Sequence, residues 1–168
     1  MKRLHALMQQ FASLEGAMVG RGPKHPTAPD PAIAESLTDF LRRHPFLRGN
    51  RSYFAFLKCY GGASVIRRDG VDFIDISGFH RFGLDLEDDA PPAYSRGWFT
   101  FSVFSEGYNG RTGRRGLDGQ FDFKVGSWAV YLRLCGQRTS RRRPFASGFL
   151  EWLTALVRYR GSVTGWVA

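Results

Sequence analysis

A long run of strand-like segments, with no helical pattern among them, most constrains the fold of this chain. Apolar side chains alternate with polar ones in these segments, and turn residues separate the segments. Five strands are predicted, at 64–67, 71–76, 98–104, 120–125 and 128–134. Strands that alternated with helices would indicate parallel βαβ units. Consecutive strands bounded by helices instead favour an antiparallel sheet against which the helices pack.

Two glycine-containing segments connect strands of this sheet. An Asp-Gly pair at 69–70 lies between the first two strands and is typical of a tight hairpin turn. In the segment 107–119 glycine recurs at every third position. A collagen helix would need many more repeats and abundant proline, so we expect a mobile hairpin loop there instead.

Three helices are predicted in the main body of the chain. Asp30 can cap the first, Pro31 suits its first turn, and Pro45 ends it. The second spans 50–60 and is capped by Asn50 or Ser52. Gly61-Gly62 follows it, as expected for a helix end in the left-handed conformation. The third runs from Pro144 to about Arg160. Their apolar stripes are formed by Ile33, Leu37, Phe40 and Leu41, by Tyr53, Phe56, Leu57 and Tyr60, and by Phe145, Phe149, Trp152, Leu153 and Leu156.

A further helix is predicted at the N-terminus, ahead of a linker. Leu4, Leu7, Met8, Phe11 and Leu14 recur at helical spacing, and polar residues interrupt what would otherwise imitate an export signal. Residues 20–31 hold half of the eight prolines, which is typical of a linker. We therefore expect a helix and linker over 1–30 and one domain over 31–168. The sequence leaves open whether the first helix packs on that domain.

These elements predict an α+β fold with an antiparallel sheet of about five to six strands and helices packed around it. Cys59 and Cys135 each lie in an apolar run and are expected to be free, buried thiols. The sequence has no apolar stretch of membrane-spanning length. Free thiols without an export signal predict a cytoplasmic protein.

The charge is distributed unevenly along the chain. The formal net charge is +9, yet the segment 69–110 carries 2 basic and 8 acidic side chains. The flanking segments 1–68 and 111–168 carry net charges of +7 and +8. A basic balance raises the expectation of an anionic partner. An acidic cluster and two arginine runs are the candidate partner-binding residues: Asp85, Glu87, Asp88, Asp89, Arg111, Arg114, Arg115, Arg138, Arg141, Arg142 and Arg143.

No pattern in the sequence indicates catalysis. The four histidines lack a second ligand at zinc spacing, and neither a phosphate-binding glycine loop nor a serine nucleophile elbow occurs. The acidic cluster lacks the alternate spacing and the turn glycine of a calcium loop. We expect a non-catalytic protein that needs no cofactor or metal and does not act at a membrane.

Several motifs resemble the SUKH superfamily, the Smi/Knr-like proteins. The resemblance rests on Phe56-Leu57 and Tyr60-Gly61-Gly62 before the first strand, and it extends over roughly 31–160. Gly97-Trp98-Phe99-Thr100-Phe101 looks like the central strand of that family and Val130-Tyr131 like a later one. The segment 145–153 is similar to its C-terminal helix. The resemblance implies a curved antiparallel sheet and no catalytic residues.

The resemblance also implies a binding function. Bacterial members are commonly immunity proteins that neutralise a cognate polymorphic toxin, often a nuclease, whereas fungal members are regulatory interaction proteins. Our leading hypothesis is an immunity protein that occludes a toxin. A nuclease inhibitor would be expected to be acidic, and this chain is basic. Either the acidic segment 85–89 docks the toxin, or the target is not a nuclease, or the role is different. The alternative functions are a nucleic-acid-binding accessory protein that uses the arginine-rich loops, or a regulatory interaction protein.

Overall fold

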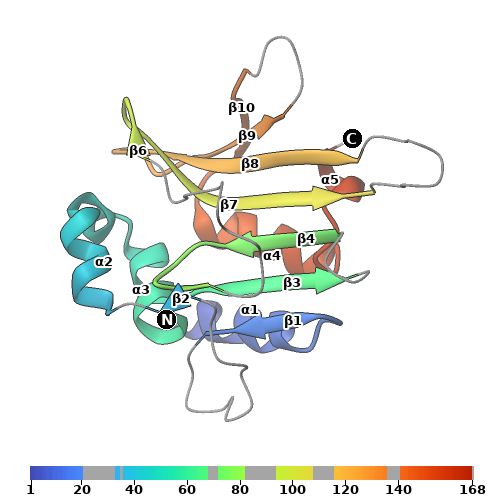
Figure 1. Ribbon diagram of the computed structural model, residues 1–168, viewed down its shortest axis with the longest axis horizontal. Helices are drawn as coiled ribbons and strands as arrows, with labels where there is room; N and C mark the ends of the chain where they lie inside the picture. Colours follow the sequence, from blue (N-terminus) through green and yellow to red (C-terminus); the bar gives the residue numbers. More distant parts are fainter. Residues whose placement is uncertain are drawn as a thin grey trace.

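The chain forms an α+β structure with one large open sheet (Figure 1). The computed structural model describes residues 1–20, 33–34, 36–67, 72–81, 94–107, 116–135 and 141–167. For 33–34, 80–81 and 166–167 it describes the backbone only. The strands are β1 (Ala17–Val19), β2 (Ile33–Ala34), β3 (Ala63–Arg67), β4 (Asp72–Ile76), β5 (His80–Arg81), β6 (Tyr94–Ser95), β7 (Trp98–Glu106), β8 (Leu117–Lys124), β9 (Val130–Leu134) and β10 (Arg143–Ala146).

Eight of these strands form the main sheet in the order β1-β3-β4-β7-β8-β9-β10, and β6 pairs with β7. Every one of these pairings is antiparallel, as the uninterrupted run of strands predicts. All five predicted strands are confirmed. The sequence missed β1, β6 and β10, which are two to four residues long. It also missed a separate small sheet of β2 and β5.

The helices are α1 (Lys2–Ala12), α2 (Leu37–Arg43), α3 (Arg51–Tyr60), α4 (Phe149–Arg158) and the short α5 (Thr164–Val167), with the 3-10 helix η1 (Pro45–Gly49). In Figure 1, α1 and α4 lie behind the strands. The rings of Tyr53 in α3 and of Phe149 in α4 contact Phe101 and Phe123 of the sheet. The sheet therefore has an inner face, which packs against helices, and an opposite outer face.

The inner face is an aromatic core centred on Tyr53. Its ring contacts five other rings, those of Phe56, Phe99, Phe101, Phe123 and Phe149. Its hydroxyl donates a hydrogen bond to the backbone carbonyl of Ser77. Burial, and secondarily the charge of Asp75, raises the pKa of Tyr53 well above 10.0. The phenol is therefore a neutral, structural donor.

Helix α3 forms as the sequence predicts. The side chain of Asn50 accepts a hydrogen bond from the Tyr53 amide and caps the first turn. Gly61 ends the helix with a φ of 76°, a left-handed conformation that glycine adopts without strain. Burial, followed by the nearby Cys59 thiol, raises the pKa of the Tyr60 hydroxyl. That hydroxyl contacts His5 Nδ1 of α1 at 2.6 Å.

The N-terminal helix packs on the rest of the molecule. Leu4, Leu7, Met8 and Phe11 are buried as one face of α1, the face that the spacing predicts. Arg3 pairs with Glu151 of α4 at 3.0 Å, and β1 forms an edge of the main sheet beside β3. The packing that the sequence left open is thereby established. Most of the predicted linker lies outside the described residues.

Two predicted helix starts are wrong. Ile33 belongs to strand β2, so the helix expected from Asp30 begins instead at Leu37, where Ser36 accepts a hydrogen bond from the Asp39 amide. Pro144 lies in β10, so the last helix begins at Phe149 rather than at the proline. Proline suits an edge strand as well as a first helical turn, and the sequence did not separate these options.

Two smaller predictions need correction, and a third falls outside the described residues. Cys59 and Cys135 do not form a disulfide, as predicted, but the first is half-buried and the second exposed, so they are not two buried thiols. The predicted glycine-rich loop 107–119 overlaps a strand, because β8 begins at Leu117. Gly119 is a packed position of that strand, where a Cβ would lie 2.7 Å from the Arg133 carbonyl. The 69–70 turn lies outside the described residues. Among the described helices none is long and apolar enough to cross a membrane.

Candidate binding surface

The outer face of the sheet carries a cluster of polar, basic and aromatic side chains over β7, β8 and β9. Strand alternation turns Phe121 and Phe123 inward, so Gln120, Asp122 and Lys124 project outward. Residues paired across strands share a face. The register places Trp98 beside Lys124, Thr100 and Tyr131 on either side of Asp122, and Arg133 beside Gln120.

Asp122 is fully buried and satisfied at the centre of this cluster. Its Oδ1 accepts hydrogen bonds from Thr100 Oγ1 at 2.7 Å and from Gln120 Nε2 at 2.6 Å. Its Oδ2 lies 2.6 Å from Arg142 Nε and 3.9 Å from Arg133 Nε. A buried carboxylate is tolerated only where it is paired and hydrogen-bonded, and Asp122 has both kinds of partner. The carboxylate therefore fixes the position of Arg142.

The indole ring of Trp98 lies beside this carboxylate network, and two cationic side chains lie over it. Arg142 Cζ lies 4.4 Å and Lys124 Nζ 4.6 Å from the centre of its ring. The Tyr131 ring meets it edge-on at 4.9 Å. We call Trp98, Lys124, Tyr131, Arg133 and Arg142 together the Trp98 surface. All five side chains are partly exposed. Lys124 and Arg142 lie over the Trp98 ring at distances where cation–π attraction is effective.

The Trp98 surface contains one of the predicted partner-binding residues, Arg142. Arg141 and Arg143 flank it and are exposed, but Arg143 pairs in register with Leu132 and so belongs to the other side of the sheet. The rest of the predicted set lies outside the described residues: Asp85, Glu87, Asp88, Asp89, Arg111, Arg114, Arg115 and Arg138. The structure thus brings one arginine of that set together with residues of β7, β8 and β9.

Four residues of the Trp98 surface, and Asp122 beneath it, were not singled out from the sequence. A signal was present, because polar residues alternate with Phe121 and Phe123 in β8. That alternation identifies an outward row, but only the register with β7 and β9 shows which outward side chains meet. Trp98 of β7 is half-buried on the outer face, beside Lys124, so its position in an aromatic-rich strand does not make it a core residue.

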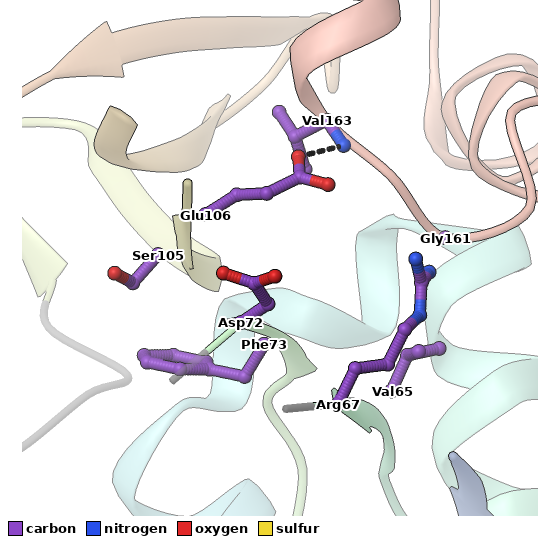
Figure 2. A pocket seen from close by; sticks show the side chains of 8 residues that line it. All are labelled: Val65, Arg67, Asp72, Phe73, Ser105, Glu106, Gly161 and Val163. Atoms are coloured by element: carbon purple, nitrogen blue, oxygen red, sulfur yellow. Dashed lines mark hydrogen bonds between the residues drawn. The ribbon is translucent and has the colours of Figure 1, made fainter. Parts of the chain in front are cut away.

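A small pocket lies at the other end of β4 and β7 (Figure 2). Arg67, Asp72 and Glu106 are the charged side chains that line it, as Figure 2 shows. Glu106 Oε2 accepts hydrogen bonds from the Val163 amide, the Thr164 amide and the Thr164 hydroxyl, at 2.6 to 2.9 Å. The cavity of about 10 Å³ has room for one water, whereas ligand sites commonly hold about 300–1,000 Å³. The pocket anchors the C-terminal segment rather than a small molecule.

His44 is the other unusual ionisable side chain. It is buried among the rings of Phe40, Phe46 and Phe99, and within the described chain neither of its ring nitrogens has a hydrogen-bond partner. Burial, aided by the positive charge of Arg43, lowers the pKa of His44 below its ordinary value of 6.5. A neutral imidazole whose described neighbours are phenyl rings is a core residue rather than a proton-transfer group.

Comparison with protein-family models, with curated proteins and with solved structures gives no match for this chain. The resemblance to the SUKH superfamily therefore remains a hypothesis that rests on its sequence motifs. The fold is compatible with a curved antiparallel sheet and surrounding helices, but an α+β architecture alone does not assign a function. Within the described structure, the Trp98 surface is the feature that points to a function.

Proposed function

We propose that this chain is a non-catalytic binding domain that docks a protein partner on the Trp98 surface. The observation that carries the proposal is the placement of Trp98, Tyr131 and Arg142 side by side on the outer face. Tryptophan, tyrosine and arginine are the residue types that most often dominate the affinity of protein interfaces. Here the arginine is already held in place by Asp122, so little conformational entropy is lost when a partner binds.

We infer further that the domain is an immunity-type protein that neutralises a toxin by occlusion. The SUKH-like motifs support this inference, and the pre-arranged surface is suited to it. Such a protein covers the substrate-binding region of its target, so no chemistry is required of its own side chains. The basic charge of the surface favours a target whose docking face is acidic, in contrast to the basic groove of a nuclease.

The test begins with affinity capture from the native host, with and without nuclease treatment. The wild-type chain and the Trp98→Ala variant serve as paired baits, and circular dichroism confirms that the variant is folded. We expect a stoichiometric protein partner that survives nuclease treatment and is lost from Trp98→Ala. Tyr159→Ala is the matched control, because Tyr159 is an exposed aromatic residue at the end of α4. This control should retain the partner.

The captured protein is then expressed alone and together with the chain. Immunity predicts that it arrests growth alone, that co-expressed wild-type chain restores growth, and that Trp98→Ala does not. A partner that is harmless alone would contradict the immunity proposal and favour a regulatory interaction protein.

Nucleic-acid binding is the second candidate, because the Trp98 surface interleaves two aromatic rings with three cations. Nucleic-acid binding predicts that whatever the chain captures is lost when the lysate is treated with nuclease. The affinity of that material should also fall steeply as salt rises from 50 to 200 mM, by an order of magnitude or more for several phosphate contacts.

A further inference from the structure

We propose that Arg142 is a pre-oriented carboxylate receptor, and that the partner inserts an Asp or Glu side chain of an acidic segment onto it. This inference rests on the proposed function and names the chemistry of the partner at the Trp98 surface. It follows from three features of Arg142: which of its nitrogens are occupied, the charge around it, and the ring on which it lies.

Arg142 uses only one of its nitrogens within the described structure. Its Nε donates to Asp122 Oδ2 at 2.6 Å, and neither terminal nitrogen has a partner among the described residues. Guanidinium is planar, so fixing Nε also fixes the plane in which the terminal N–H groups lie. The side chain is 28% exposed, so a partner can reach it. This arrangement prepares the terminal nitrogens for an anion.

The charges around Arg142 leave the surface positive. Asp122 is the one described carboxylate within 4.0 Å of Arg142 or Arg133, and Lys124 has no such partner among the described residues. Among the described residues this surface therefore holds three cations, Lys124, Arg133 and Arg142, and one carboxylate. Asp122 cannot turn away to neutralise an incoming cation, since Thr100 and Gln120 hold its other oxygen. The site consequently favours an anion and repels a lysine or arginine.

The contacts of Trp98 favour a carboxylate over a nucleic-acid base. Arg142 and Lys124 both lie over its ring within 4.6 Å, and Tyr131 meets it edge-on. Sites that bind single-stranded nucleic acid stack bases on accessible aromatic rings. A base that stacked on Trp98 would have to displace Arg142 or Lys124 from the ring. A carboxylate meets no such competition, because it binds the outward N–H groups of a guanidinium already stacked on the indole. The occupant that fits is an acidic peptide segment.

The full-length chain, labelled with nitrogen-15, is titrated with two probes: a peptide of ten glutamates and a decathymidylate. The signals followed are the Trp98 indole N–H and the Arg142 Nε–H. We expect the glutamate peptide to shift both signals and to bind more tightly than decathymidylate. Arg142→Lys keeps the charge but loses the planar fork, and should weaken peptide binding by about tenfold. Arg158→Lys, at an exposed position at the end of α4, should leave it unchanged.

Three outcomes would overturn the inference: peptide binding that Arg142→Lys leaves unchanged, peptide-induced shifts that miss Trp98 and Arg142, or tighter binding of decathymidylate through the same two signals. The last would assign the surface to nucleic acid. The proposed function fails separately. If the captured protein requires Trp98 but tolerates Arg142→Lys, the function stands and the carboxylate receptor is wrong. If the peptide binds Arg142 and no protein is captured, the receptor stands and the proposed function is wrong.

Discussion

Individual residues of this protein show how burial decides the role of a polar group. Asp122 and His44 are both buried, yet the carboxylate has four neighbouring donors or cations, whereas the imidazole is surrounded by phenyl rings. The buried carboxylate organises a surface, because its partner Arg142 reaches solvent. The buried imidazole only fills space, and it does so in its neutral form.

The lowered pKa of His44 makes the stability of the protein depend on pH. The unfolded chain binds a proton near pH 6.5, but the folded chain binds it only at lower pH. We therefore expect the free energy of unfolding to be fully maintained above pH 6.5 and to decrease as pH falls from 6.5 toward the folded pKa. Urea unfolding at pH 7, 6 and 5 measures this slope.

His44→Phe should reduce the slope between pH 7 and 5. Arg43→Gln serves as the control and should keep most of the slope, because burial is the larger cause of the shift. If the free energy of unfolding changed with pH equally in wild type and His44→Phe, His44 would not be the source of the pH dependence.

Tyr53 separates the contribution of a ring from that of a hydroxyl. Tyr53→Phe keeps the ring contacts but leaves the Ser77 carbonyl without its donor, which should lower the free energy of unfolding by about 1–3 kcal/mol. Tyr53→Ala also empties the centre of the aromatic core and should cost about 3–5 kcal/mol. Urea unfolding compares the two, and a Phe variant as unstable as the Ala variant would show that the hydroxyl, not the ring, dominates.

At the scale of elements, the N-terminal helix is the most informative. Helix α1 buries Phe11 completely and pairs Arg3 with Glu151 of α4, although a proline-rich segment separates it in sequence from the rest. An amphipathic helix must cover its apolar face with another element. Here α4 and the rest of the core provide that cover, and β1 extends the sheet directly after the helix.

Phe11→Ala tests whether α1 is part of the cooperative fold. We expect it to lower the free energy of unfolding by about 3–5 kcal/mol, as for other fully buried aromatic residues. Gln10→Ala, at an exposed position of the same helix, should change it by no more than about 0.5 kcal/mol. A Phe11→Ala variant as stable as wild type would mean that α1 is an appended segment.

The elements also show where sequence analysis succeeds and where it fails. Strong local signals predicted α3, whose ends carry Asn50 and Gly61, and the long strand β7, in whose sequence Phe99, Phe101 and Val103 alternate with polar residues. The structure interrupts this alternation with a register shift between Thr100 and Ser102. Strands β1, β6 and β10 are too short to show a period, and they exist because a neighbouring strand offers hydrogen bonds. The Trp98 surface was missed for a related reason: it is assembled by register between strands, which no single segment encodes.

At the scale of the whole molecule, the two faces of the sheet are suited to different tasks. The inner face is apolar and aromatic and packs against α3 and α4, which stabilises the fold. The outer face holds a buried carboxylate beneath exposed cations and rings at the β7–β9 end. The described helices α3 and α4 pack on the inner face, so changes to the Trp98 surface should alter binding without unfolding the core. We therefore expect substitutions on the Trp98 surface to change partner affinity and substitutions on the inner face to change the free energy of unfolding.

Hydroxyl-radical footprinting of the purified complex with the captured partner tests this central claim most directly. The reactivity of each aromatic side chain is compared in the free and bound chain, with Tyr159 as the internal reference because it is exposed at the end of α4. The account predicts that Trp98 and Tyr131 become protected on binding and that Tyr159 remains reactive. Protection of Tyr159 with unchanged Trp98 and Tyr131 would contradict it and place the partner away from the outer face.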